Sequence, residues 1–132
     1  MQDRAQILLL CADSQTRSEM AEWIKKSGAN PLMPVGVKET RTVLAHNSVS
    51  VVFCEDQLVS REFRGLLSHK PSGIAKVPLI VISRTGGWAE YLEALRYGAF
   101  EFIALPAEFN EVQAIVRRAL RAARYRGVAL IN

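Results

Sequence analysis

Val49-Ser-Val-Val-Phe-Cys-Glu55 decides the fold, because this short apolar run delivers a carboxylate at its C-terminal end. An apolar run of this length, bounded by polar residues, is typical of a strand buried on both faces. Similar runs occupy residues 7–11 and 77–82. In open parallel sheets, side chains just past the C-terminal strand ends line the functional crevice. The residues that follow these runs are Cys11, Ala12, Asp13, Glu55, Asp56, Ser83 and Arg84.

Strand-like and helix-like segments alternate along the chain. The strand-like segments span residues 7–11, 31–35, 49–53, 79–82 and 100–104, and apolar residues at helical spacing follow each of them. Two prolines in the second segment indicate an edge strand, and the third helix is expected at residues 60–67. The pattern predicts a flavodoxin-like three-layer α/β sandwich, with a five-stranded parallel sheet of order 2-1-3-4-5 and five helices.

The chain length of 132 residues is that of one ordinary domain. We expect residues 1–126 to form this domain. Residues 127–132 are expected to be a C-terminal extension, which could begin a linker to an output domain.

Composition argues against several classes of protein. The hydrophobic fraction of 49% and the charged fraction of 23% are those of a soluble globular protein. No apolar run approaches the roughly 20 residues that span a bilayer. Two cysteines in apolar strands suggest reduced thiols in a cytoplasmic protein, and no Cys/His cluster has metal-ligand spacing. We therefore expect no membrane contact, no metal and no cofactor.

The formal net charge of +4 is unevenly placed. Arginines crowd the last helix and its exit, where they suit the negative end of the helix dipole. They could also contact a protein or a nucleic acid. Because interleaved aromatic residues and a DNA-binding motif are missing, we expect no nucleic-acid ligand for this domain. These arginines are Arg117, Arg118, Arg121, Arg124 and Arg126.

Gly98-Ala-Phe-Glu-Phe-Ile-Ala-Leu-Pro106 carries the most specific pattern: a Gly-Ala pair, an aromatic at Phe102 and a closing proline. With residues 7–13, 51–55 and 78–83, it resembles the receiver domain of bacterial two-component response regulators, over nearly the whole chain. The resemblance implies phosphoryl transfer from a histidine kinase to an aspartate at the end of the third strand. It also implies an acidic pair that holds magnesium, and a Ser/Thr and a Lys that contact the phosphoryl group.

Most of these positions are substituted here. The acidic pair falls on Cys11 and Ala12, the acceptor on Glu55 and the lysine on Leu105, whereas Ser83 keeps its hydroxyl and Phe102 keeps the aromatic switch position. Magnesium requires oxygen ligands, and phosphoryl transfer requires charge neutralisation around the transferring oxygens. The substitutions therefore predict a degenerate receiver without a metal site.

The substitutions at the site together change its charge in a consistent way. Loss of two acids removes the need for a divalent cation, and Glu55 then stands as a negative charge with fewer like-charged neighbours. Asp13 is suited to cap the following helix. Arg84 could reach into the vacated space and pair with Glu55 or Asp56, or it could point to solvent, as surface arginines commonly do. Leu105 is expected to serve in packing.

Cys11 and Cys54 lie on neighbouring strands of the predicted sheet. Alternation of side chains along the third strand turns Cys54 away from the crevice and into a helix layer. We expect two reduced thiols, of which Cys11 is the more reactive.

The sequence therefore predicts a non-enzymatic signalling module that acts through protein–protein interaction, independently of phosphorylation. The resemblance places a partner, an output domain or a second copy on the fourth helix, fifth strand and last helix, with Tyr97, Arg117 and Arg121 as candidate contacts. An alternative on the same fold is a flavin- or nucleotide-binding protein, although no glycine-rich phosphate loop follows the first strand. A hydrolase that uses Ser83 or a cysteine lacks a placed histidine base.

Overall fold

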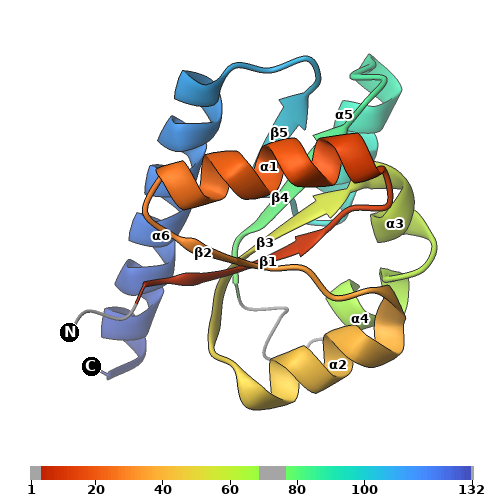
Figure 1. Cartoon of the computed structure of the whole chain (residues 1–132). Helices are drawn as coiled ribbons and strands as arrows, with labels where there is room; N and C mark the ends of the chain where they lie inside the picture. The colour runs from red at the N-terminus through yellow and green to blue at the C-terminus, as the bar shows by residue number, and fades with distance from the viewer. Residues whose placement is uncertain (1–3, 69–76, 132) are drawn as a thin grey trace.

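Five parallel strands form one sheet in the order β2-β1-β3-β4-β5 in the computed structural model, which describes residues 4–68 and 77–131 (Figure 1). The order and direction of the strands confirm the predicted flavodoxin-like sandwich, with β2 at an edge. The strands are β1 (Gln6–Leu10), β2 (Asn30–Leu32), β3 (Val49–Glu55), β4 (Leu79–Ser83) and β5 (Glu101–Ala104). The helices are α1 (Ser14–Lys26), α2 (Gly36–His46), α3 (Asp56–Ser60), α4 (Arg64–Ser68), α5 (Trp88–Arg96) and α6 (Phe109–Ile131).

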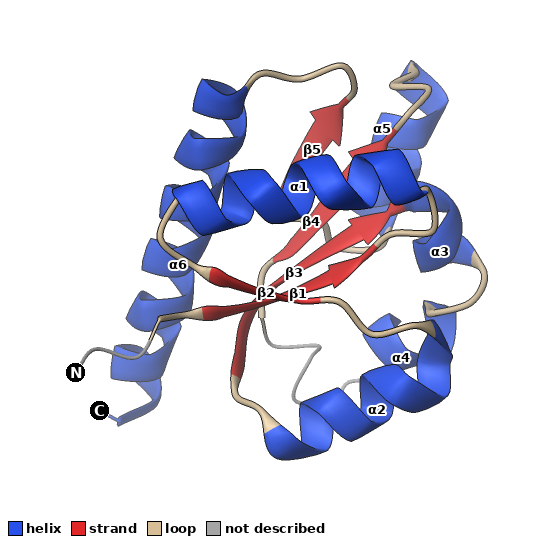
Figure 2. Ribbon diagram, viewed as in Figure 1, coloured by secondary structure: helices blue, strands red, loops and turns tan. Residues whose placement is uncertain are grey.

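Helices cover both faces of the sheet (Figure 2). Helices α1 and α6 pack on one face, over Leu9, Phe53 and Ile82. Helices α2 to α5 pack on the other face, over Leu8, Val52 and Val81. Because successive side chains of a strand point to opposite faces, both layers draw on the same apolar runs. This explains why the central strands read as continuous hydrophobic segments.

The prediction of a single third helix at residues 60–67 was wrong, and with it the count of five helices. The described residues contain two short helices here, so their helices number six. Arg61 leaves the helical region, with φ −124° and ψ −84°. Phe63 turns into the core, where it is 2% exposed, and its N–H bonds the Leu58 carbonyl at 2.8 Å. Burial of the Phe63 ring thus accompanies a break in the helix that the spacing of apolar residues predicted.

The last helix, α6, continues to Ile131, so the backbone of residues 127–131 prolongs the helix. Within residues 4–68 and 77–131, none of the helices combines the length and the hydrophobicity that crossing a bilayer requires.

Candidate functional site

Glu55 closes β3 at the carboxyl edge of the sheet, and its side chain is only 3% exposed. One carboxylate oxygen, Oε1, accepts hydrogen bonds from the backbone N–H of Ala12 at 2.7 Å and of Asp13 at 3.2 Å. These donors belong to the loop between β1 and α1, some forty residues away in sequence. A buried carboxylate requires such donors, because an unpaired charge in the interior is costly. Glu55 therefore ties the end of β3 to the beginning of α1.

Arg84 supplies the cation for this carboxylate. Its Nε donates to Glu55 Oε2 at 3.2 Å, and its Nη1 lies 3.6 Å from Asp13 Oδ1. The structure thus places Arg84 across the crevice, with its side chain still half-exposed to solvent. Asp56 is not its partner: Asp56 Oδ1 accepts from the N–H of Gln57 at 2.8 Å, in the first turn of α3. The Arg84–Asp56 pair was therefore the wrong alternative, because Asp56 already belongs to the next helix.

The Asp13 carboxylate contacts Thr16 through one oxygen and Arg84 through the other. Its Oδ2 accepts from the Thr16 N–H at 2.9 Å and from the Thr16 hydroxyl at 2.7 Å, which caps the N-terminus of α1. These hydrogen bonds, followed by the charges of Arg84 and Arg17, hold the pKa of the Asp13 carboxyl below its usual range. Because the Thr16 hydroxyl is committed to Asp13, it is poorly placed to bind a phosphate.

Cys11 and Cys54 are free thiols in different layers. Cys11 packs in the α1–α6 layer and Cys54 in the opposite one. Burial, reinforced by the negative charge of Glu55, raises the pKa of Cys11 to about 12. Burial also raises the pKa of Cys54 well above its ordinary value. Since the thiolate is the reactive form, neither thiol is activated at neutral pH.

Ser83 ends β4 and is fully buried. Its Oγ accepts from the Gly86 N–H at 2.9 Å and lies 3.2 Å from the Thr85 hydroxyl. Gly86 has φ +63°, and a Cβ there would stand 2.9 Å from the Cβ of Ala104. Only glycine meets both conditions without strain. Ser83, which keeps the hydroxyl of the family's switch position, therefore organises the loop that leads to α5.

Phe102 lies half-buried on β5 and contacts Tyr91 edge-on, with ring centroids 5.5 Å apart. Tyr91 in turn lies 5.4 Å from Trp88, so three rings connect β5 to the start of α5. Leu105 packs against the α1–α6 core, and its N–H donates to the Ser83 carbonyl at 2.9 Å. Of these residues, sequence analysis missed the roles of Thr85 and Trp88, because neither occupies a position that the resemblance singles out.

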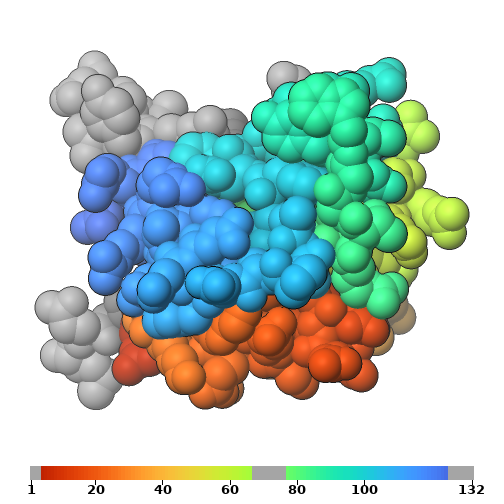
Figure 3. Space-filling view, turned by 90° about the horizontal axis from the view of Figure 1, so that it is seen from above, coloured from red at the N-terminus to blue at the C-terminus, as the bar shows by residue number. Residues whose placement is uncertain are grey.

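The carboxyl edge of the sheet brings these segments together. Seen from above, α1 in orange lies beside the green-to-teal atoms of the β4–α5 region and the cyan-to-blue atoms of β5 and α6 (Figure 3). The crevice therefore combines the carboxylates of Glu55 and Asp13 with the guanidinium of Arg84. Arg84 thus compensates one of the two negative charges of this set.

Magnesium, which the receiver resemblance implies, does not fit these residues. The N–H groups of Ala12 and Asp13 point at the Glu55 carboxylate, and a backbone donor repels a cation. Cys11 offers sulfur, a soft ligand that suits other metals. In the described part of the chain, no group of three or more His, Cys, Asp or Glu side chains is arranged to hold a metal ion.

Solved structures of other proteins show to which fold class the chain belongs. No protein-family model matches the chain. The signal receiver domain of a putative Luxo repressor protein from Vibrio parahaemolyticus superposes with a TM-score of 0.78, at 12% identity, over 96% of this chain and 97% of that one. NtrX from Brucella abortus superposes with a TM-score of 0.73, at 18% identity, over 98% of this chain and 30% of that one. The chain has the receiver fold of response regulators.

The amino-acid sequence of the chain is also similar to that of one kind of response regulator. The chain is 25% identical over 115 residues to a putative NtrX-like response regulator from Rickettsia bellii. The match covers 86% of this chain, which spans only 24% of the length of that relative. The fold and this similarity together support a role in receiver-domain signal transduction.

Proposed function

We propose that this chain is a phosphorylation-independent receiver module, not an enzyme, which signals through protein–protein contact. The observation that carries the proposal is the state of Glu55 at the acceptor position. Its two oxygens are bound by two backbone N–H groups and by Arg84. A carboxylate so engaged is neither exposed to a phosphoryl donor nor flanked by ligands for a divalent cation.

The same contacts support a fixed output conformation. Arg84 is the first residue of the loop to α5, and the hydrogen bond from the Gly86 N–H to Ser83 Oγ holds that loop. Glu55 therefore stabilises, through Arg84, one arrangement of the segment that begins α5. In the family, phosphorylation produces the change in this segment; here the ion pair of Glu55 and Arg84 takes that place.

The proposed docking surface comprises α5, β5 and α6. Three apolar side chains of α5, spaced at helical intervals, are exposed: Trp88 by 72%, Leu92 by 43% and Leu95 by 49%. Phe100, just before β5, is 39% exposed. Contiguous exposed apolar side chains commonly mark protein interaction sites. They support this surface better than Tyr97, which packs against the core.

Charged residues border the apolar stripe. Arg118 on α6 bonds Glu101 of β5 at 2.8 Å, and Arg117 and Arg121 are exposed on the same helix. This polar rim around an apolar centre is the usual composition of an interface. We infer that a protein partner, an output domain or a second copy docks here, in the cytoplasm.

Phosphoryl labelling tests the proposal. The chain is incubated with acetyl phosphate, with and without magnesium chloride, and its intact mass is measured. We expect no added phosphoryl group under either condition. Labelling at Glu55 or Asp56 would overturn the proposal. The flavin- or nucleotide-binding alternative takes second place, because Glu55 and Arg84 lie across the crevice that such a cofactor would enter.

A further inference from the structure

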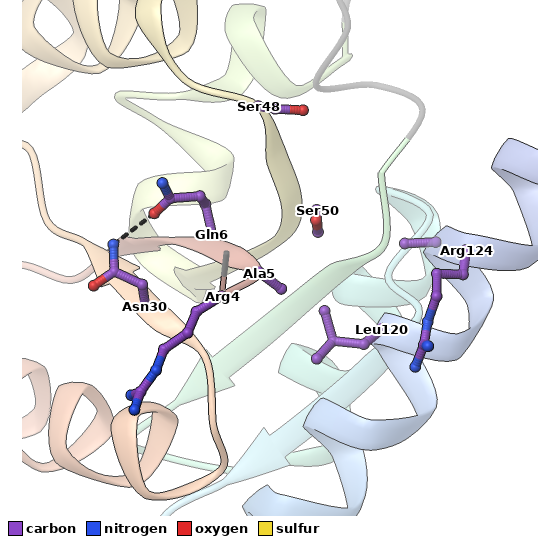
Figure 4. Close-up of a pocket in the computed structure, with 9 residues that line it drawn as sticks. Arg4, Ala5, Gln6, Asn30, Ser48, Ser50, Leu120 and Arg124 are labelled. Atoms are coloured by element: carbon purple, nitrogen blue, oxygen red, sulfur yellow. Dashed lines mark hydrogen bonds between the residues drawn. The ribbon is translucent and has the colours of Figure 1, made fainter. Parts of the chain in front are cut away.

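A second candidate site lies at the opposite, amino-terminal edge of the sheet. A cavity of about 750 Å³ opens there between the beginnings of β1, β2 and β3 and the C-terminal half of α6. Its volume falls within the roughly 300–1,000 Å³ typical of small-molecule sites. Figure 4 shows Ala5, Ser50 and Leu120 near the middle of this space, with Gln6 and Asn30 on one side and Arg124 on the other.

The lining is positively charged. Arg4 and Arg124 both line the cavity, and none of the lining residues that the structure describes carries a carboxylate. Neither guanidinium forms an ion pair with a carboxylate of residues 4–68 or 77–131. Guanidinium groups bind phosphate oxygens through paired N–H donors, and more strongly than a neutral donor does. The charge of the cavity therefore selects an anion.

A β-bulge turns a serine toward this cavity. Gln6 pairs with Val49, but the next residue, Ile7, pairs with Val51, so Ser50 is an extra residue on β3. Bulges re-aim a side chain and are over-represented next to functional sites. Ser50 also interrupts an otherwise apolar central strand, where packing alone favours a β-branched side chain. With Ser48, it gives the cavity two hydroxyls.

The remaining walls suit a flat organic body. Asn30 Nδ2 donates to Gln6 Oε1, which leaves the Gln6 amide hydrogens and the Asn30 carbonyl oxygen for the edge of a planar ligand. Leu120 and Ala123 of α6 form an apolar wall against which such a body can pack. A simple inorganic ion uses neither feature.

We propose that this cavity binds a small organic phosphate with a flat polar body, such as a nucleoside monophosphate. Arg124 holds the phosphate beside the α6 wall, and Arg4 and the amide pair, which Figure 4 shows on the opposite side, hold the polar edge of the body. This site lies at the other end of the strands from Glu55.

Nuclear magnetic resonance titration of the 132-residue chain tests the inference, with adenosine monophosphate, adenosine and inorganic phosphate as separate probes. We expect adenosine monophosphate to shift the amide signals of Gln6 and Ser50 saturably, with a dissociation constant on the order of 1 mM or tighter. Adenosine and phosphate should each bind about tenfold more weakly, because each lacks half of the contacts.

Variants separate this cavity from general surface charge. The double variant Arg4→Gln/Arg124→Gln should bind adenosine monophosphate about tenfold more weakly. This is the effect of losing one or two charged hydrogen bonds. The matched control is Arg117→Gln, an exposed arginine of α6 outside the cavity, which should leave binding within about twofold. No saturation by about 10 mM, an equal loss in the control, or shifts centred on Glu55 would each overturn the proposal.

Discussion

Arg84 Nε lies 3.2 Å from Glu55 Oε2, so the residue that follows β4 neutralises the carboxylate that ends β3. Glu55 is almost completely buried, whereas the Arg84 side chain is half-exposed. The pair is therefore open to solvent on one side only, which moderates its strength.

Removing either member of this pair should lower stability. We expect Arg84→Ala to reduce the free energy of unfolding by about 1 kcal/mol, and Glu55→Gln by about 1–2 kcal/mol. The double variant should show a coupling of about 0.5–1 kcal/mol in urea denaturation. Arg96→Ala is the control, because Arg96 is 80% exposed and pairs with Glu93 at 3.6 Å. If the double variant is simply additive, the contact contributes nothing.

Asp13 should make stability depend on pH in the acid range. Because its folded-state pKa is lowered, its contribution is present above the unfolded-state pKa of roughly 3.9 and is lost as pH falls through the folded value. Asp13→Asn keeps a capping oxygen but removes the charge. We expect the melting temperatures of the two proteins to differ at pH 6, and this difference to narrow as pH falls below about 3.9. A difference that persists unchanged would mean that the charge plays no part.

The thiols should be inert in the folded chain. Both pKa values are raised by burial, so at about pH 8 alkylation by iodoacetamide should be slow in buffer and fast in urea. Because the folded-state pKa values are raised, stability should fall as pH rises above roughly 9, where only the unfolded thiols ionise. Intact mass after timed quenching gives the rates. Rapid single labelling of Cys11 in buffer would restore the expectation from sequence.

Rebuilding the family's acidic site tests whether these few residues disable it. Glu55→Asp alone should fail to label, because the shorter carboxylate still lacks a metal and a lysine. Adding Cys11→Asp and Ala12→Asp should create magnesium affinity, but should reduce metal-free stability by roughly 1 kcal/mol or more through repulsion.

Two further changes complete this series. Leu105→Lys supplies a cation for the phosphoryl oxygens, and Arg84→Ala removes the guanidinium that now lies across the crevice. We expect acetyl phosphate to label only variants that carry all four site replacements, and Arg84→Ala to increase that labelling. Labelling by Glu55→Asp alone would show that Glu55 is the single obstacle.

The apolar stripe of α5 should govern association. Leu92→Glu places a charge in its middle and should abolish self-association or partner capture, which sedimentation velocity and pull-down experiments measure. Val35→Glu is the control, because Val35 is 76% exposed but follows β2 at the far edge of the sheet. Equal effects of both variants would show that general surface hydrophobicity, and not this surface, drives association.

Local patterns were enough to predict much of the molecule. Continuous apolar runs marked the buried strands, paired prolines marked the edge strand, and Glu55 was located at the end of β3 by its place after such a run. These features depend on residues next to one another, so the sequence records them directly. The failure at residues 60–67 arose because helical spacing did not show that the backbone leaves the helical region at Arg61.

The tertiary structure decided what the site residues contact. Glu55 meets the N–H groups of Ala12 and Asp13 across more than forty residues, and Arg84 chooses Glu55 and Asp13 over Asp56. The cavity behind Ser50 likewise depends on a register shift between β1 and β3. Such contacts depend on how distant loops meet at the strand ends. The sequence by itself determined which side chains reach each edge of the sheet, and packing alone determined how they pair.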